Sequence, residues 1–376
     1  MKKLFFIAVA VMAMAACSRT EMNDVVRNNA INFQTATSLN TKVTGAVFPT
    51  TETFGTYCWT NGTDGTLFID NDEVAYDANH NIWTTTHNTY YWPKNGSLDF
   101  ISYYPYNMEG VTIAKNQIDY NLDFWDAYAK SAITSDIMYS DKAVGFTDNA
   151  NEVQDGTETA SQNGYEGVPT IFRHAAAKVR VMVVLGENEK TEAATGTKTK
   201  WTVKLNKVQL TDVLSKGSCT LTLNTTPTTG IVGWTKPAGE VWTADETVKR
   251  TYESNCNQSL TLGQGCVAVD YKFMLPQALT TNQQKVYLDV DIDTYRAAAG
   301  EDYPTEPTLH QSNVIVSTDL LIRDEASGVA IVDSWKMNQS ITYTVTLGPA
   351  GKQITFDPAT ANWDNKAYDT NIELDI

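Results

Sequence analysis

Strict alternation of apolar and polar residues marks the second half of the chain. It is clearest in residues 178–185, 201–205, 286–293 and 341–347. Successive side chains of a β-strand point to opposite faces, so a period of two predicts strands that bury one face. No helical segments alternate with these strands, which excludes a parallel α/β fold. The pattern predicts antiparallel sheets packed face to face, as in a sandwich.

Aromatic residues mark the strands expected in the first half. Residues 54–59 form one short aromatic strand, and residues 90–93 lead through Asn95-Gly96 into residues 98–105. Asn-Gly between two such runs favours a tight hairpin. The one helical candidate spans Asp123 to Asp141 and is weakly amphipathic. The fold class expected is therefore all-β, with a short helix or two in loops.

The length of 376 residues allows two or three domains, and we expect two. Residues 147–168 are polar and Gly-rich, which is typical of a linker or long loop. We place the boundary at their end, near Pro169. Residues 30–168 then form an N-terminal sandwich and residues 169–376 a C-terminal one.

The first residues indicate export. Residues 1–16 combine a basic start with a short apolar run and small residues before Cys17. Such a run is too short to span a membrane and is typical of a signal peptide. Cysteine after two alanines indicates a lipoprotein, with diacylglycerol and palmitate-type chains on Cys17 holding the protein at the outer membrane. An ordinary secretory peptide with an incidental cysteine is the alternative. Residues 17–29 would form a polar tether.

The charge of the chain limits its partners. It has 28 Lys and Arg against 44 Asp and Glu, a net charge of −16. Such a chain repels phosphate backbones, which excludes non-specific nucleic-acid binding.

Four cysteines follow Cys17, namely Cys58, Cys219, Cys256 and Cys266. They allow three pairings, and no Cys-x-x-Cys motif indicates a metal or redox site. Cys219 shares an apolar strand face and is expected in the core. Cys256 and Cys266 flank a probable hairpin and could form a disulfide if oxidised.

No arrangement of residues indicates catalysis, a cofactor or a bound metal. The chain has four histidines and no nucleophile motif to pair with them, and His174 is expected to pack or hydrogen-bond. Residues 263–268 match part of a dinucleotide-binding pattern, but a strand follows where a helix should begin. Asp289, Asp291 and Asp293 lie on one solvated strand face and lack the calcium-loop spacing. We expect no enzyme activity.

Several segments together resemble the fimbrillin family, the lipoprotein subunits of type V pili in the Bacteroidetes. They are residues 30–33, 54–57, 91–93, 98–105, 135–139, 172–174, 274–277, 335–347, 354–356 and Trp363. The resemblance implies two tandem transthyretin-like antiparallel β-sandwiches and export to the cell surface. It also implies that a protease removes the first strand and that an extended segment of a neighbouring subunit takes its place.

The end of the chain offers a strand for such an exchange. Ile372, Leu374 and Ile376 alternate with acidic residues and would insert on one face. The alternative is that residues 371–376 form the last strand of their own domain.

The expected cleavage site departs from the family pattern. Members are typically cut after an Arg in the loop after the first strand, whereas the matching loop here, residues 39–44, offers Lys42. Arg27 precedes the first strand, so a cut there would remove only the tether.

The sequence therefore predicts a surface lipoprotein subunit of a pilus that supports adhesion. Its partners would be other pilus subunits, the outer membrane through the lipid, and a host or bacterial surface ligand. The alternative is a lipid-anchored glycan-binding module, because the chain has nine tryptophans and exposed tryptophan stacks on sugar rings.

Overall fold

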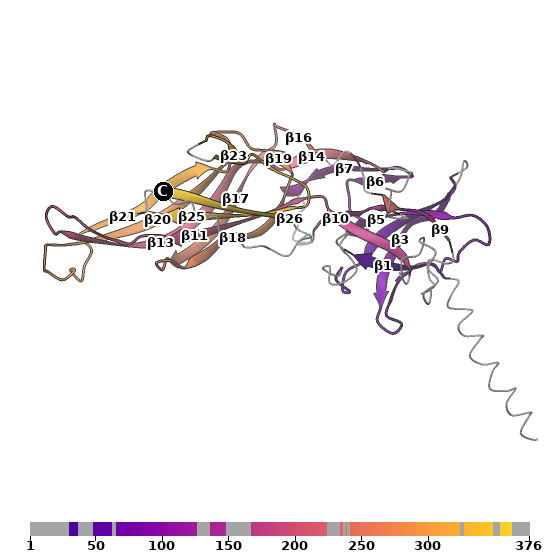
Figure 1. The fold of residues 1–376 in the computed structure, drawn as a ribbon, viewed down its shortest axis with the longest axis horizontal. Coiled ribbons are helices and arrows are strands. Elements are labelled where there is room, and N and C mark those ends of the chain that lie inside the picture. The colour runs from indigo at the N-terminus through magenta and orange to yellow at the C-terminus, as the bar shows by residue number, and fades with distance from the viewer. Residues whose placement is uncertain are drawn as a thin grey trace, which may run out of the picture. The chain divides into compact units, whose positions relative to one another are not determined.

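The computed structural model describes residues 30–36, 48–61, 65–125, 136–147, 167–223, 234–235, 238, 241–323, 327–348 and 354–362, with only the backbone of 234–235 and 354–362. Of the described residues, 64% lie in strands and 1% in helix, which confirms the all-β prediction (Figure 1). No helix in the described ranges is long and apolar enough to cross a membrane.

Ten strands precede residue 175. They are β1 (Asn32–Ala36), β2 (Phe54–Thr60), β3 (Leu67–Asp77), β4 (Ile82–Thr85), β5 (Leu98–Tyr104), β6 (Val111–Ala114), β7 (Gln117–Asp123), β8 (Met138–Ser140), β9 (Lys142–Phe146) and β10 (Val168–His174).

The later strands include the longest ones. They are β11 (Ala177–Leu185), β12 (Glu189–Thr191), β13 (Lys198–Leu214), β14 (Lys216–Thr222), β15 (Trp234–Thr235), β16 (Thr243–Ala244), β17 (Lys249–Ser259), β18 (Gly265–Met274), β19 (Gln277–Ala278), β20 (Lys285–Ala297), β21 (Leu309–Asp319), β22 (Ile322–Arg323), β23 (Ala330–Val332), β24 (Ser334–Trp335), β25 (Gln339–Leu347) and β26 (Ile354–Asn362).

The helix expected from Asp123 to Asp141 is tested only at its ends. Residues 124–125 are helical, β8 occupies the far end, and residues 126–135 lie outside the described part. The prediction of an aromatic hairpin was wrong, because β5 pairs with β2, β8 and β9. Residue Tyr91 makes only an isolated bridge to Ala30. Local composition favoured the hairpin, and strand pairing over longer range overrode it.

The chain divides into two compact units, and each unit takes more than one stretch of it. Unit 1 comprises Met1–Asp119, Ile137–Arg173 and Leu221–Gly239. Unit 2 comprises Tyr120–Asp136, His174–Thr220 and Glu240–Ile376. The division near Pro169 into two tandem transthyretin-like sandwiches stays a prediction.

Unit 1 is built on a nine-stranded sheet with the order β15-β9-β5-β2-β3-β4-β1-β10-β8. An additional pairing of β5 with β8 closes seven of these strands, β5-β2-β3-β4-β1-β10-β8, into a ring. Aromatic side chains dominate the core inside it, including Phe33, Phe48, Phe54, Trp83, Trp92, Phe100 and Phe172.

Unit 2 contains two larger sheets. One has the order β18-β11-β25-β26, and the other has β12-β13-β20-β21 with β17 also paired to β13. Figure 1 shows β13, β20 and β21 running side by side. The core is mostly aliphatic and uses the apolar positions of the alternating segments, such as Val181, Leu205, Val290 and Val345. The strands predicted from that alternation are confirmed by β11, β13, β20 and β25.

Three smaller sheets complete the described strands, with the orders β16-β14-β7-β6, β19-β24 and β22-β23.

Two strand pairs run parallel, although the sequence predicted antiparallel sheets. They are β1 with β10 and β11 with β25. Side chains alternate in the same way in parallel and antiparallel strands, so the pattern does not define strand direction.

Candidate functional site: β1 and its slot

The first described strand, β1, lies between two partners. It pairs antiparallel with β4, where Phe33 faces Trp83. On its other edge it pairs parallel with β10, in a register that runs from Phe33–Val168 to Ala36–Ile171. We call the place between β4 and β10 the β1 slot. Because both edges of β1 are paired, the strand closes the ring of unit 1 at this point.

Two apolar side chains fix β1 to the core. Ile31 is 1% exposed and Phe33 is 2% exposed. The Phe33 ring meets Phe54 and Phe100 edge to face, with centroids 6.0 Å and 5.8 Å away. Full burial of such side chains stabilises by about 1.5–3 kcal/mol each. The β1 strand is therefore held in the slot by its backbone pairing and by apolar side chains at alternate positions.

Gly167, directly before β10, lets the β1 backbone approach closely. Its φ is +132°, and an added Cβ would lie 2.8 Å from the carbonyl oxygen of Asn32 and 3.0 Å from the nitrogen of Phe33. Both atoms belong to the backbone and cannot turn away. A side chain at this position would push β1 out of register with β10.

The start of β1 is held by the loop after β4. The nitrogen of Ile31 donates to the carbonyl of Tyr90 at 2.9 Å, and Ala30 bridges to Tyr91. The loop, residues 86–91, is therefore part of the slot.

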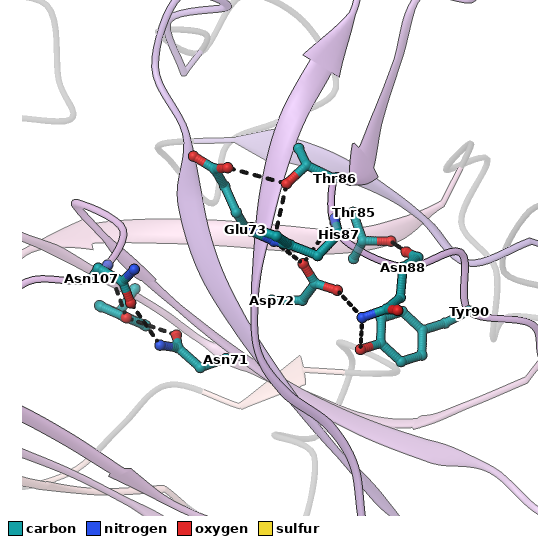
Figure 2. A network of polar contacts seen from close by, with 10 residues as sticks. Asn71, Asp72, Glu73, Thr85, Thr86, His87, Asn88, Tyr90 and Asn107 are labelled. Carbon is teal, nitrogen blue, oxygen red and sulfur yellow. Dashed lines mark hydrogen bonds and ion pairs between the residues drawn. The ribbon is translucent and has the colours of Figure 1, made fainter.

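A buried carboxylate on β3 holds this loop in place (Figure 2). The Asp72 side chain is 1% exposed. Its Oδ1 lies 2.8 Å from His87 Nδ1 and accepts from the His87 backbone nitrogen at 3.3 Å. Its Oδ2 accepts from Asn88 Nδ2 at 3.5 Å. A buried carboxylate needs such partners, and here the loop supplies them.

Further hydrogen bonds in Figure 2 tie the loop to its neighbours. Thr86 donates from its nitrogen to the Glu73 carbonyl at 2.9 Å and from Oγ1 to the Glu73 carboxylate at 3.1 Å. Asn88 Nδ2 also donates to the Tyr90 hydroxyl at 3.3 Å. Burial, and then the charge of Asp72, raises the pKa of Tyr90, so its hydroxyl stays neutral at pH 7.

This network does not have the geometry of a catalytic site. Thr86 Oγ1 lies 3.3 Å from His87 Nδ1, the same ring nitrogen that faces Asp72. A nucleophile and an orienting acid must contact opposite nitrogens of the imidazole. Among the described residues, no group of three or more His, Cys, Asp or Glu could hold a metal ion.

The residues predicted to carry lipid, cleavage and exchange all lie outside the described part of the chain. They are Cys17, Arg27, Lys42, Ile372, Leu374 and Ile376. Lys42 follows β1 in sequence, between Ala36 and the next described segment, which begins at Phe48.

Other predictions concern described residues. His174 is buried and its ring contacts Asp136, as expected of a hydrogen-bonding residue. Cys219 is 3% exposed and belongs to the core. Cys58, Cys256 and Cys266 are free thiols, and burial raises the pKa of Cys256 and of Cys266.

Sequence analysis missed the buried charges of unit 1, namely Asp72, Asp99, Asp141, Lys142 and Arg173. Arg173 makes two bonds to Asp141, at 2.6 Å and 2.9 Å. A signal was present in the sequence, since Asp99 interrupts the apolar run of β5, where every residue is buried. A charge inside such a run needs a buried partner.

The tryptophans that motivated the glycan-binding alternative are mostly buried. Those at 8% exposure or less are Trp59, Trp83, Trp92, Trp201, Trp242 and Trp335. Trp125 is partly buried against the core of unit 2. The six buried side chains present no open face for a sugar ring.

Comparison with known proteins identifies the family. The model of the fimbrillin-like family matches residues 41–363, so the chain belongs to the fimbrillin-like family. This membership supports a role as a pilus subunit in adhesion at the cell surface, and such subunits are not enzymes.

Several solved structures match the chain at low sequence identity. A fimbrial protein from Bacteroides vulgatus is 13% identical, with a TM-score of 0.48, 89% of this chain covered and 99% of that one. A proposed cell adhesion protein from Bacteroides uniformis is 16% identical, with a TM-score of 0.47 and coverages of 89% and 98%. The fimbrial anchor protein Mfa2 from Porphyromonas gingivalis is 11% identical, with a TM-score of 0.33 and coverages of 90% and 99%. No curated protein matches the chain.

Proposed function

We propose that the protein is a lipoprotein precursor of a pilus subunit, and that it assembles by strand exchange at the β1 slot. The precursor is anchored at the outer membrane through lipid on Cys17. Proteolysis then removes β1, and a strand from another subunit fills the vacated slot. Filaments formed in this way support adhesion to a host or bacterial surface.

The observation that carries this proposal is the place of β1 in the ring. Both of its edges are paired, so its removal would leave β4 and β10 with facing rows of unpaired N–H and C=O groups. It would also uncover the core around Phe54 and Phe100. A strand inserted from outside would restore the hydrogen bonds and refill the apolar positions at every second residue.

The segment before Phe48 must contain the cleavage site if only β1 is to be released. Lys42 meets this requirement, because a cut there leaves β1 with no covalent link to the rest of unit 1. A cut at Arg27 lies before β1 and leaves the slot occupied. We therefore propose a protease that accepts Lys at this position.

Residues 371–376 are the proposed exchanging strand. Ile372 and Leu374 have the same spacing as Ile31 and Phe33, the two core residues at the start of β1. Insertion would bury them at the same alternate positions, at about 1.5–3 kcal/mol for each side chain.

The N-terminal sequence of protein sheared from cells tests the cleavage step. The expected new N-terminus is Val43, and Lys42→Ala should block both cleavage and filament formation while Arg27→Ala leaves them intact. Sheared filaments whose subunits retain residues 30–42 would contradict the proposal.

Truncation after Thr370 tests the exchanging strand. The truncated chain should fold and reach the surface but form no filaments under negative-stain microscopy. Filaments of normal length from this variant would exclude residues 371–376 as the donor.

A further inference from the structure

Three side chains that take no part in the β1 slot meet within unit 1. Lys142 is the first residue of β9, Asp99 lies in β5, and Asn116 lies in the turn between β6 and β7. The ammonium Nζ of Lys142 is 2.9 Å from Asp99 Oδ2 and 2.9 Å from Asn116 Oδ1. A primary amine therefore lies within hydrogen-bond distance of both a carboxylate and a carboxamide.

The backbone fixes all three positions. β5 and β9 are neighbouring strands, with Phe100 facing Ala143 in the register. The second carboxylate oxygen of Asp99 accepts from the nitrogen of Gly145 at 2.9 Å, which sets the plane of the carboxylate. The carbonyl of Asn116 accepts from the nitrogen of Leu223 at 2.9 Å. Preorganised groups at this range reach high effective concentrations.

The amine is removed from water. The Lys142 side chain is 0% exposed and that of Asp99 is 4% exposed. Water is therefore kept from competing with Asp99 and Asn116 for the amine. Only a neutral amine has the lone pair that attacks a carbonyl carbon. Asn116 itself is exposed, so a small leaving group can escape to solvent.

We propose that Lys142 and Asn116 form an intramolecular isopeptide bond. Asp99 takes a proton from the ammonium, and the neutral Nζ attacks Cγ of the Asn116 carboxamide. A new Nζ–Cγ bond forms and the Cγ–Nδ2 bond breaks. Nζ loses two protons in all, and both pass through Asp99 to the departing nitrogen, which leaves as an ammonium ion. No oxidant or other reactant is consumed, and Asp99 ends as the carboxylate it began as.

The crosslink would join two stretches of unit 1 that are separated in sequence by a segment of unit 2, residues 120–136. Asn116 lies shortly before the chain leaves unit 1 at Asp119, and Lys142 lies shortly after it returns at Ile137. A covalent bond here closes a loop between residues 26 positions apart. It would hold unit 1 together under the load that the proposed role in a filament places on a subunit, whether or not β1 is exchanged.

Peptide mapping of the full-length protein by mass spectrometry tests this proposal. Trypsin does not cut after an acylated lysine, so the peptide that begins at Ser131 should continue past Lys142. It should be joined to the peptide that begins at Asn116, with a total mass lower by one ammonia. Separate peptides of unmodified mass, one of them ending at Lys142, would overturn the proposal. Loss of one water would also overturn it, because the acyl donor would then be the Asp99 carboxylate and not the Asn116 carboxamide.

Matched variants assign the three roles. Lys142→Arg and Asn116→Ala should each abolish the joined peptide, and Asp99→Asn should abolish or greatly slow its formation. Lys115→Arg, next to Asn116 in the same turn, should leave it unchanged. A joined peptide that persists in Asn116→Ala would exclude this residue as the acyl donor. Because the wild-type map decides the main question, a variant that fails to fold does not remove the test.

Discussion

The two units of this protein solve the problem of a β core in different ways. Unit 2 buries aliphatic residues from long, regular strands such as β13 and β20, while unit 1 packs aromatic rings inside a closed ring of shorter strands. Every buried Asp, Lys and Arg of the described chain belongs to unit 1. The strand proposed to be exchanged also lies in unit 1. The contrast shows that unit 1 relies on pairing between specific buried side chains, whereas unit 2 relies on burial of apolar surface.

The largest difference between the units should come from breaking a buried ion pair. Asp141→Asn leaves the charge of Arg173 buried without its partner, and such losses cost about 3–5 kcal/mol. In unit 2, Lys285→Met breaks the partly exposed pair of Lys285 and Asp319, 3.6 Å apart, and should cost about 1 kcal/mol or less. Urea denaturation with amide hydrogen exchange in each unit measures both. Equal losses of unfolding free energy in the two variants would contradict the proposed difference between the two units.

A smaller effect is expected at the β1 slot itself. Gly167→Ala would add a Cβ against the β1 backbone at a left-handed φ, and we expect a loss of about 1–3 kcal/mol. Amide exchange at Phe33 and Gln34 should accelerate most. Gly263→Ala in unit 2 is the control, since its φ is +70° and no atom lies within 4 Å of the added Cβ. If both variants leave the rates of amide hydrogen exchange in β1 unchanged, the close approach at Gly167 does not hold the strand.

The smallest effect concerns the acidic face of β20 in unit 2. A hydrogen bond from the nitrogen of Asn313 lowers the pKa of Asp291 below its ordinary value of 3.8. Stability from this contact is therefore present above about pH 4 and is lost as the pH falls through the folded-state value. The difference in stability between wild type and Asp291→Asn should shrink on acidification from pH 7 to pH 2. A difference that grows would contradict the stated direction.

Sequence patterns predicted unit 2 better than unit 1, for a physical reason. A strand with one apolar face, such as β11 or β25, shows its alternation directly. In β5 every residue is buried, Asp99 included, so no alternation remains to be read. Ring closure by β5 and β8, and the parallel pairing of β1 with β10, depend on contacts between residues far apart in the chain. No local pattern encodes them.

In the candidate site, too, local sequence patterns predicted some features and missed others. Ile31 and Phe33 are apolar residues at alternate positions, and the sequence predicted a first strand there. It did not predict Gly167 or Asp72, because their roles come from segments that lie far from β1 in sequence. A glycine before a strand and an acid within one are too common to indicate a function alone.

Refilling of the emptied β1 slot tests the central claim most directly. A full-length variant would carry a specific protease site in place of residues 39–44, and hydrogen exchange of β4 and β10 would be followed after cleavage. The account predicts that β1 dissociates, that amides of Trp83 and Ile171 lose protection, and that a peptide of residues 366–376 restores it. A peptide with Asp in place of Ile372 and Leu374 should not. If β1 remains bound after cleavage, or protection returns equally with either peptide, the slot is not a site of strand exchange.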